Sequence, residues 1–359
     1  MSEKASVLMA MSGGLDSSVA ALILQQQGFN VIGITMKVWS YDRTLACSNH
    51  AACCDTDAIS DAQNLAVTLN IPHYVVDLQK EFEEFVINNF ISEYLKGRTP
   101  NPCVNCNIHL KWHALLKKAD QLGCDYIATG HYAKIREEKG NYILSKGLDE
   151  TKEQSYVLWG LTQEQLKRTL FPLSDLHKSE IRKIAQDHGF TRIANKRESY
   201  DICFIPNGDY REFLNLRVEG LRERFKNGDF LNAKGEKIGK HKGFPYYTIG
   251  QRKGLEIALG KPQYVTKINA ETNEITLGDT EDLLTETLTS SHFNLMQSLE
   301  EHKIYEVKIR YKTKASPAMV HLENNLLKVK FLEPVSAVTS GQSAVIYAGD
   351  DVLGGGIID

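Results

Sequence analysis

A loop near the N-terminus carries the residues best suited to chemistry in this chain. The segment Ser12-Gly13-Gly14-Leu15-Asp16-Ser17-Ser18 offers backbone N–H groups, hydroxyls and one carboxylate over a short distance. Two glycines let the backbone turn sharply, and a helix that opens at Asp16 adds the positive end of its dipole. The segment therefore predicts an anion cradle, with hydroxyls near phosphate oxygens and Asp16 holding Mg²⁺ beside a pyrophosphate. The alternative is a plain Gly-Gly turn between a strand and a helix.

This loop is not the P-loop of an enzyme that transfers the γ-phosphate, because no Gly-Lys-Ser or Gly-Lys-Thr follows it. Its pattern Ser-Gly-Gly-x-Asp-Ser-Ser resembles the PP-loop of ATP pyrophosphatases. The resemblance implies that ATP is cleaved between its α- and β-phosphates and that AMP is transferred to an oxygen of the substrate. The expected ATP-binding residues are Ala10, Met11, Ser12, Gly13, Gly14, Leu15, Asp16, Ser17, Met36 and Gly130.

Cysteines form the second group of candidate reactive residues. Cys103 and Cys106 lie in a loop rich in proline and asparagine and have the Cys-x-x-Cys spacing of a redox pair or of two ligands of one metal. Cys203 is distant in sequence, so it can meet them only through the fold. A reactive thiol needs a depressed pKa, for which a helix N-terminus or the nearby Lys111 is the expected cause. The remaining thiols are expected to be packing or incidental residues: Cys47, Cys53, Cys54 and Cys124.

Alternating strand and helix patterns over residues 1–206 supply the scaffold that must position these groups. Strands are predicted at Ser6–Ala10, Val31–Met36, His73–Asp77 and Tyr126–Thr129. Helices are predicted at Ser17–Gln27, Thr56–Leu69, Phe82–Lys96, Leu110–Leu122 and Lys178–His188. This order is typical of an α/β fold with a doubly wound, mostly parallel sheet, which binds ligands at the carboxyl ends of its strands. The glycine loop, Met36 and Gly130 should therefore share one edge of the sheet.

The pattern of the chain changes after Cys203. Residues 209–227 have the periodicity of one amphipathic helix, and short glycine-rich β segments follow. From about residue 282 onward, alternating runs predict a small antiparallel β-barrel. These runs are Tyr305–Tyr311, Ala318–Leu322, Leu326–Phe331 and Ser343–Tyr347. We expect three domains: a PP-loop ATP-binding catalytic domain at 1–206, a small central domain at 207–280 and a C-terminal β-barrel at 281–359.

Composition points to a globular protein of the cytoplasm. Of the 359 residues, 42% are apolar and 24% are charged. No apolar run approaches the roughly 20 residues of a membrane span. The N-terminal residues show no signal-peptide core, so we expect a cytoplasmic protein with reduced thiols and no membrane association.

Two basic runs stand out against a net charge of −3. The first consists of Lys234, Lys237, Lys240, Lys242, Arg252 and Lys253, and the second of Lys303, Lys308, Arg310, Lys312 and Lys314. Such runs are often solvated surface, but two of them outside the nucleotide domain suggest a polyanionic partner. Within the first run, Lys240-His241 and Arg252 suit contacts with RNA phosphates.

Longer segments of the chain resemble one family. The resemblance is to bacterial tRNA-specific 2-thiouridylases, and it is carried by MSGGLDSS, GRTPNPC, ATGHYA, DETKEQSYVL, ESYDICFI, GKHKGFPYYTIGQRKGL and RYKTKASP. It implies a tRNA-modifying sulfurtransferase with a PP-loop domain of the adenine nucleotide alpha-hydrolase type, a central domain and a C-terminal β-barrel. ATP would adenylate the 2-oxygen of the wobble uridine, and sulfur would replace that oxygen to give 2-thiouridine, AMP and pyrophosphate. The implied partners are the anticodon arm of tRNA and a protein that donates or relays sulfur.

The resemblance also assigns roles to residues. Cys203 would carry sulfur as a persulfide, and Cys106 would be its partner thiol, with a Cys106–Cys203 disulfide formed when the sulfur departs. The implied tRNA-binding residues are Asn101, Pro102, Cys103, Lys152, Glu153, Gln154, Arg310 and Tyr311. His131 is expected to support the ATP loop rather than to transfer protons.

Cys103 departs from the family pattern, because many members have aspartate at this position. Cys103, Cys106 and Cys203 could therefore also hold a [4Fe–4S] cluster whose unique iron binds external sulfide. Two further alternatives are another PP-loop adenylating enzyme, such as an amidotransferase, a small-molecule synthetase or a tRNA-lysidine type ligase, and a non-catalytic RNA-binding or iron–sulfur scaffold. An amidation reaction does not require three thiols, which weighs against the first alternative. A non-catalytic scaffold does not require a pyrophosphate site, which weighs against the second.

Overall fold

The structure is a computed structural model that describes residues 4–39, 54–196, 202–205, 208–257 and 260–359. Cys47 and Cys53, which we expected to be packing or incidental thiols, lie outside the described residues. The chain divides into two compact units. Unit 1 comprises Met1–Val86, Cys103–Phe204 and Asp350–Val352, and unit 2 comprises Ile87–Pro102, Ile205–Gly349 and Leu353–Asp359.

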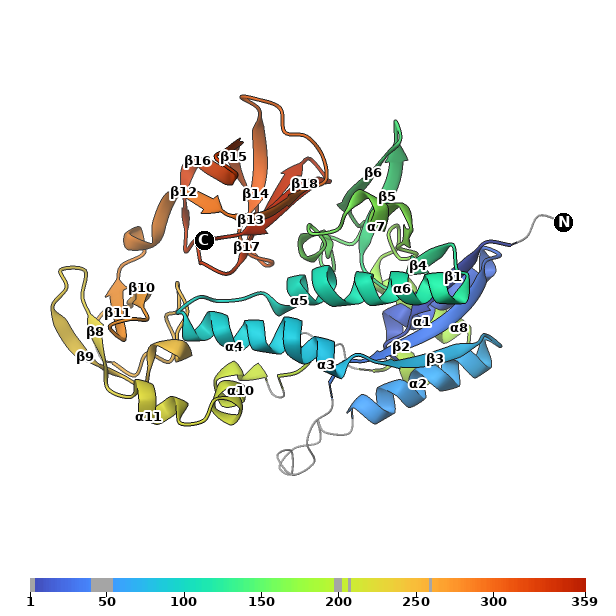
Figure 1. Cartoon of the computed structure of the whole chain (residues 1–359), viewed down its shortest axis with the longest axis horizontal. Helices are drawn as coiled ribbons and strands as arrows, with labels where there is room; N and C mark the ends of the chain where they lie inside the picture. Colours follow the sequence, from blue (N-terminus) through green and yellow to red (C-terminus); the bar gives the residue numbers. More distant parts are fainter. Residues whose placement is uncertain (1–3, 40–53, 197–201, 206–207, 258–259) are drawn as a thin grey trace. The chain divides into compact units, whose positions relative to one another are not determined.

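Unit 1 is built on a parallel sheet with the strand order β3-β2-β1-β4-β7 (Figure 1). Its strands are β1 (Ser6–Ala10), β2 (Asn30–Lys37), β3 (His73–Asp77), β4 (Tyr126–Ala128) and β7 (Thr169–Leu170). From β1 the chain winds outward to β3 and then returns to β4 on the other side of β1. The direction of winding thus reverses between β1 and β4, and ligands of such sheets bind at this switch point. The predicted doubly wound α/β fold is confirmed.

Helices cover both faces of this sheet. The main helices are α1 (Leu15–Gln26), α2 (Cys54–Thr68), α6 (Trp112–Leu122) and α8 (Lys178–Asp187). Side chains alternate along β1: Val7 and Met9 share a buried core with residues of α1, α2 and α8, whereas Leu8 lies on the opposite face. Helix α6 packs against β1 and β4. Among the described helices, none is both long and apolar enough to cross a membrane.

Shorter elements complete unit 1. They are α3 (Gln79–Phe82), η2 (Glu83–Ile87), α5 (Pro102–Asn105), η3 (Cys106–Lys111), β5 (Ala133–Glu138), β6 (Asn141–Lys146), η4 (Ser155–Val157), α7 (Gln163–Lys167) and α9 (Thr191–Ala194). The β5–β6 hairpin was not predicted. Residues Asp351 and Val352 pair with β6, and Arg136 clamps the Asp351 carboxylate through two hydrogen bonds of 2.7 Å. This two-point contact fixes the distant residues 350–352 in unit 1.

The first part of unit 2 combines three helices with a four-stranded sheet. The helices are α4 (Asn88–Leu95), α10 (Tyr210–Arg217) and α11 (Leu221–Phe225). The sheet order is β10-β11-β8-β9, formed by β8 (Gly228–Leu231), β9 (Lys237–His241), β10 (Tyr264–Asn269) and β11 (Glu274–Gly278), with η6 (Phe244–Tyr246). The prediction of one helix over 209–227 is wrong. Val218 is extended and Gly220 has a φ of +66°, so the chain turns between α10 and α11.

The second part of unit 2 is an antiparallel β structure. Its strands are β12 (Leu284–Ser290), β13 (His292–Leu295), β14 (Ile304–Lys308), β15 (Ser316–Glu323), β16 (Leu326–Ser336), β17 (Ser343–Ala348) and β18 (Asp351–Ile357), with η7 (Glu281–Leu283) before them. The first two residues of β18 belong to unit 1. The strands pair in the order β12-β16-β15-β14-β17, and β13 pairs with β18. The predicted antiparallel architecture is confirmed. The run expected at Tyr305–Tyr311 ends at Lys308, however, so Arg310 and Tyr311 lie in the turn after β14.

Candidate active site

The glycine loop joins β1 to α1 and leaves the start of the helix open to a ligand. Gly14 is the N-cap of α1, and no side chain caps the first turn, so its backbone N–H groups have no intrahelical partner. Gly13 has a φ of +66°, and a Cβ on it would lie 2.1 Å from the Ala58 carbonyl oxygen, which leaves room for glycine alone. The Ser12 amide donates a hydrogen bond of 3.1 Å to Ser17 Oγ. The loop is therefore a preformed cradle for an anion.

Gly130 brings the end of β4 against this loop. A Cβ on Gly130 would lie 2.9 Å from the Ser17 backbone nitrogen and 3.0 Å from the Asp16 carbonyl carbon. Because β1 and β4 are neighbours at the switch point, their two loops meet at the carboxyl edge of the sheet, as predicted. Met36 lies near the end of β2, at the same edge. The contacts of these residues with ATP remain predictions.

Lys178 supplies the ammonium group that the loop itself lacks. Its Nζ lies 2.7 Å from Asp16 Oδ1 and 2.9 Å from Oδ2. Tyr132 donates a further hydrogen bond of 2.6 Å to Asp16 Oδ1. Only 12% of the Lys178 side chain is exposed, so its charge acts in a partly desolvated site. The sequence did not reveal Lys178, because it is far from Asp16 in the chain and no motif marks it. Tyr132 lies in the ATGHYA segment, but nothing in the sequence indicated its contact with Asp16.

A second lysine holds the loop from the other side. Lys196 donates to the Gly13 carbonyl oxygen at 3.1 Å and to Asp61 Oδ2 at 3.0 Å. Asp61 is 5% exposed and also pairs with Arg192 at 3.0 Å. The Lys196 contact fixes the orientation of a glycine whose conformation shapes the cradle.

Asp16 fits the predicted role of a Mg²⁺ ligand as a single carboxylate. Magnesium usually binds one or two protein carboxylates together with substrate phosphates and waters. In this structure the Lys178 ammonium group contacts both carboxylate oxygens of Asp16. Bound phosphates would therefore have to attract the ammonium group away from Asp16 before Mg²⁺ could bind the carboxylate. A Mg²⁺ held there would neutralise charge on the phosphates.

The three predicted thiols influence one another in unit 1. Cys106 begins η3, a π-helical turn of a kind often found at functional sites. Burial, together with the charges of Cys106 and Cys103, raises the pKa of Cys203 to about 12. Burial likewise raises the pKa of Cys103 and of Cys106. Cys103 and Cys203 keep exposed surface, so reagents can reach them although many protein atoms surround each thiol.

The expectation of a depressed thiol pKa is wrong. Lys111 does lower the pKa of Cys103, Cys106 and Cys203, as its position in the sequence suggested. Burial outweighs the lysine at all three, because an apolar surrounding penalises the thiolate more than one ammonium group stabilises it. The thiols therefore remain protonated at neutral pH in the protein without ligands.

Lys111 also links the thiols to the nucleotide loop. Burial lowers the pKa of His131 well below its usual value, and the Lys111 charge lowers it further. His131 is thus neutral, and its Nδ1 lies 2.8 Å from Thr129 Oγ1. His131 directly follows Gly130, which packs against the first turn of α1. One lysine therefore acts on both the thiols and the loop beside the cradle, and the neutral imidazole suits support rather than proton transfer.

The Lys111→Met variant is expected to alkylate more slowly at Cys203. Loss of the ammonium group raises the thiol pKa further, so the thiolate fraction at pH 8 to 9 falls, by several-fold up to about tenfold. The rate of iodoacetamide labelling, followed by mass spectrometry as a function of pH, measures this change. Lys117→Met, on the exposed side of α6, is the matched control. An unchanged labelling rate in Lys111→Met would show that the lysine does not control the thiol.

The structure places the predicted tRNA-binding residues in several surroundings. Glu153 is 8% exposed and accepts a hydrogen bond from the Ser155 amide, and Gln154 Oε1 accepts one of 3.0 Å from the Tyr132 amide. Arg310 Nη2 donates to the Ile249 and Ala337 carbonyl oxygens at 2.9 and 3.0 Å. Asn101 and Pro102 belong to unit 2, whereas Cys103 and Lys152 belong to unit 1. Tyr311 is 37% exposed. Contacts of these residues with tRNA remain predictions.

The three thiols do not form a ready metal site. In the described ranges, no group of three or more His, Cys, Asp or Glu side chains is arranged to hold a metal ion. The donor set of Cys103, Cys106 and Cys203 thus lacks the convergence that a cluster requires.

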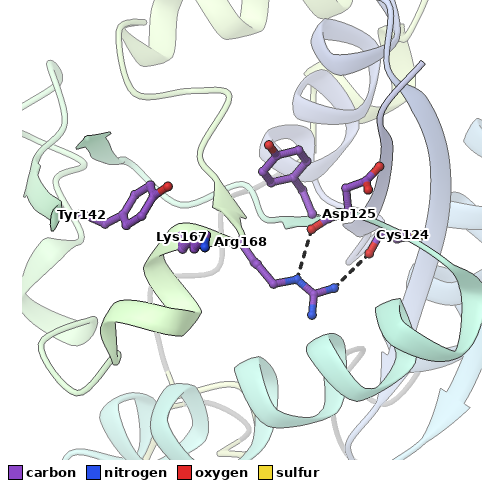
Figure 2. A pocket seen from close by; sticks show the side chains of 6 residues that line it. Cys124, Asp125, Tyr142, Lys167 and Arg168 are labelled. Atoms are coloured by element: carbon purple, nitrogen blue, oxygen red, sulfur yellow. Dashed lines mark hydrogen bonds between the residues drawn. The ribbon is translucent and has the colours of Figure 1, made fainter. Parts of the chain in front are cut away.

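A separate pocket in unit 1 lies away from these groups. It is lined by Cys124, Asp125, Tyr126, Tyr142, Lys167 and Arg168 (Figure 2). Arg168 donates to the Asp125 and Cys124 carbonyl oxygens at 3.1 and 2.9 Å and pairs with Asp120 at 2.6 Å. Because β4 begins at Tyr126, this pocket is at the amino edge of the parallel sheet, opposite the glycine loop. Cys124 is 4% exposed there, which suits a packing thiol.

Comparisons with known proteins agree with this arrangement. Family models described as the tRNA methyl transferase HUP domain, the tRNA methyl transferase PRC-barrel domain and the aminomethyltransferase beta-barrel domain match residues 5–207, 218–279 and 285–358. A tRNA-specific 2-thiouridylase MnmA from Cytophaga hutchinsonii is 49% identical, over 100% of this chain and 98% of its own length. One of the same name from Amoebophilus asiaticus is 50% identical, over 99% of this chain and 96% of its own.

Likeness to solved structures is weaker. A 4-thiouridine synthetase in complex with RNA and ATP is 17% identical with a TM-score of 0.38, over 60% of this chain and 51% of that one. The relatives, by contrast, match along the whole chain at about half of all positions, and the segments that first suggested the family lie within the matched length. The chain belongs to the tRNA-specific 2-thiouridylase family, MnmA.

Proposed function

We propose that this protein is a tRNA sulfurtransferase that uses ATP to convert the wobble uridine of certain tRNAs into 2-thiouridine. One observation carries the proposal: an anion cradle and three cysteines share unit 1, and Lys111 acts electrostatically on the thiols and on the loop beside the cradle. The names of the relatives support the same substrate and reaction.

The cradle would serve the first step, the activation of uridine. The 2-oxygen belongs to a urea-like carbonyl group and leaves poorly unless it is activated. In the proposed step this oxygen attacks the α-phosphorus of ATP, a C–O–P linkage forms, and the Pα–O bond to pyrophosphate breaks. Backbone N–H groups at the start of α1 and the Lys178 ammonium group would stabilise the negative charge that develops on the phosphates. The ATP-binding set would be that of the sequence analysis, from Ala10 to Ser17 with Met36 and Gly130.

The thiols would serve the second step, the entry of sulfur. A persulfide on Cys203 is more acidic than the parent thiol, so it can ionise where a thiol of pKa about 12 does not. Its terminal sulfur attacks C2 of the adenylated uridine, and AMP leaves with the oxygen. Cys106 then attacks the inner sulfur of Cys203, the S–S bond to the new 2-thio group breaks, and the Cys106 proton passes to the departing 2-thiouracil ring. A Cys106–Cys203 disulfide remains. A thiol reductant must supply two electrons to reset the site.

The raised thiol pKa values give this scheme a physical advantage. Protonated thiols do not attack the adenylated uridine, so an enzyme without loaded sulfur would not form a dead-end adduct through Cys103, Cys106 or Cys203. Sulfur loading by a donor or relay protein would switch Cys203 from inert to nucleophilic. The proposed setting is the cytoplasm, where unmodified tRNA and reduced thiols are available, with domains at 1–206, 207–280 and 281–359.

Methyl transfer, which the family-model descriptions name, suits this chain less well. A methyl transferase activates its donor rather than its acceptor, so it needs neither a pyrophosphate cradle nor a set of thiols beside it. Amidation by a related PP-loop enzyme would use the cradle but leave the thiols without a role.

The proposal is tested by incubating the protein with ATP, Mg²⁺, a persulfide donor and unmodified tRNA, with nucleosides analysed by mass spectrometry. We expect 2-thiouridine to appear together with equal amounts of AMP and pyrophosphate, and only when tRNA is present. Release of ADP, or formation of AMP at the same rate with and without tRNA, would contradict the proposal. Thiolation that appears only after iron and sulfide are reconstituted would replace the persulfide step by the cluster alternative.

A further inference from the structure

A turn between β6 and η4 is hydrogen-bonded to the residues around Asp16. The turn consists of residues 149–154, and its first connection passes through Tyr132. The Tyr132 amide donates to Gln154 Oε1 at 3.0 Å, and the Gln154 amide donates to the Tyr132 carbonyl oxygen at 2.9 Å. The Tyr132 hydroxyl donates in turn to Asp16 Oδ1 at 2.6 Å. Tyr132 therefore joins this turn directly to the carboxylate of the glycine loop.

Tyr132 is held too tightly to move independently of its two partners. Only 3% of its surface is exposed, and a Cβ on Gly147 would lie 2.9 Å from its carbonyl carbon. The Lys178 Nζ lies 5.7 Å from the centre of the Tyr132 ring, which is within range of a cation–π contact. A buried side chain with both ends bound transmits displacement, because close-packed interiors have little room to absorb it. A shift of the Gln154 backbone should therefore move the Tyr132 hydroxyl.

Asp149 makes a second connection from the same turn. Its Oδ1 accepts hydrogen bonds from the Thr151 amide at 3.0 Å and from the Thr151 hydroxyl at 2.6 Å. Its Oδ2 accepts one of 2.8 Å from the Lys178 amide, at the first residue of α8. Burial opposes ionisation of Asp149, but these hydrogen bonds lower its pKa, so the carboxylate is charged at neutral pH. The turn thus also fixes the start of the helix that carries Lys178.

Both connections end at the ion pair between Asp16 and Lys178. Tyr132 and Lys178 bind the same carboxylate oxygen, Asp16 Oδ1, at 2.6 and 2.7 Å. The ammonium group has two alternative partners, the Asp16 carboxylate in this structure and the phosphates of ATP in the proposed function. If Lys178 turns to the phosphates, the Tyr132 hydroxyl still holds Oδ1 and keeps the carboxylate oriented. The position of the turn therefore influences which partner the ammonium group takes.

The outer side of the turn can be reached by RNA. Glu150 and Thr151 are exposed, and Lys152 and Gln154 keep part of their surface exposed. Gln154 Nε2 donates no hydrogen bond to any residue that the structure describes, although Oε1 of the same amide accepts one from Tyr132. An amide of this kind can donate to phosphate oxygens or to base edges. Gln154 can thus contact RNA through one end of its side-chain amide while the other end stays on Tyr132.

We propose that Tyr132 and Asp149 are positioning residues that couple RNA at the turn to the Asp16–Lys178 pair, so that bound RNA favours transfer of the Lys178 ammonium group to the phosphates of ATP. The proposal rests on the proposed function and adds the route by which the nucleotide site responds to tRNA. Coupling between two ligands is reciprocal, so ATP must favour RNA binding by the same factor. The route would make AMP formation depend on tRNA, since Lys178 turns to the phosphates most readily when RNA is in place.

The test is the affinity of the full-length protein for α,β-methylene-ATP with Mg²⁺, measured with and without saturating unmodified tRNA. This analogue cannot be cleaved between its α- and β-phosphates, so binding is separated from the chemistry. We expect tRNA to lower the wild-type Kd for the analogue about tenfold, and the analogue to lower the Kd for tRNA by the same factor. Isothermal titration measures the first Kd, and fluorescence anisotropy of labelled tRNA measures the second.

The Tyr132→Phe variant removes only the hydroxyl group and should largely abolish the coupling. Both factors should fall below about twofold, whereas each affinity measured alone should change by less than about threefold. Asp149→Asn replaces one acceptor oxygen by an amide group and should lower both factors in the same direction. The matched control is Tyr142→Phe, which removes a hydroxyl that donates to Glu137 Oε2 at 3.2 Å on the β5–β6 hairpin. This control should keep the wild-type factors.

Each outcome separates this proposal from the proposed function. Wild-type coupling factors in Tyr132→Phe, or a wild-type protein whose affinity for the analogue does not respond to tRNA, would overturn the proposal even if 2-thiouridine forms. Equal weakening of both affinities measured alone, with the factors unchanged, would reduce Tyr132 to a structural role and overturn the proposal as well. Coupling that depends on Tyr132 in a protein that makes no 2-thiouridine would support the proposal and contradict the thiolation instead.

Discussion

The Cys203→Ser variant is expected to lose 2-thiouridine formation by at least about a thousandfold while it still binds ATP and tRNA. A serine hydroxyl cannot carry persulfide sulfur, so the covalent step has no substitute. Cys203 is exposed and makes no disulfide, and serine has nearly the same shape, so the fold should be unaffected. Mass spectrometry of the tRNA nucleosides measures the loss, and nucleotide and tRNA titrations check that binding persists.

Two further cysteine variants make this prediction specific. Cys124→Ala removes a buried thiol at the opposite edge of the sheet and should leave thiolation within about twofold of wild type. Cys103→Asp introduces aspartate, the residue that the family resemblance leads us to expect at this position. This variant should retain activity if Cys106 and Cys203 are the only thiols that the reaction needs. Substantial thiolation by Cys203→Ser would exclude Cys203 as the sulfur carrier. Loss of activity in Cys103→Asp would instead point to a role for the third thiol.

The Lys178→Met variant should bind ATP at least about tenfold more weakly. The missing ammonium group is a charge-assisted contact in a site where only 12% of the lysine side chain is exposed, and such contacts contribute roughly 1.5–3 kcal/mol. The KM for ATP should rise with it, since phosphate charge would be left less compensated. Isothermal titration with ATP in the absence of tRNA measures the binding separately from the chemistry.

Controls distinguish a phosphate-binding role from a structural one. Lys183→Met lies on the exposed part of the same helix, α8, and should leave ATP affinity unchanged. Lys178→Arg keeps the charge and should recover part of the affinity. Thermal unfolding shows whether the loss of the ion pair with Asp16 destabilises unit 1. If a folded Lys178→Met protein keeps its full affinity for ATP, Lys178 only forms the ion pair with Asp16 and does not bind phosphate.

The α/β scaffold and the place of the cradle could be predicted from the amino-acid sequence. Strand and helix periodicity are local properties, and the Gly13-Gly14 pair marks a turn in which Gly13 has a conformation that few other residues adopt. The order of strands along the chain then implied a parallel sheet with its ligand edge after β1 and β4. Longer motifs identified the family. The prediction from local patterns was wrong at 209–227. The amphipathic periodicity continues there across the helix break at Val218 and Gly220, so the sequence suggested one helix where the structure has two.

Tertiary structure alone decided the electrostatics of the site and of the basic surface. The Lys178–Asp16 pair joins residues that are far apart in the chain, and no pattern in the sequence announces such a contact. Lys111 was a candidate from its position, yet the net effect on Cys203 depends on burial, which is a property of the packed unit. The basic runs could be recognised in the sequence. Only the structure shows that Asp229 and Glu256 form ion pairs with three lysines of the first run, whereas Arg252 and Lys253 form none with the described residues. Charge interactions depend on distance and solvent exposure, and the fold sets both.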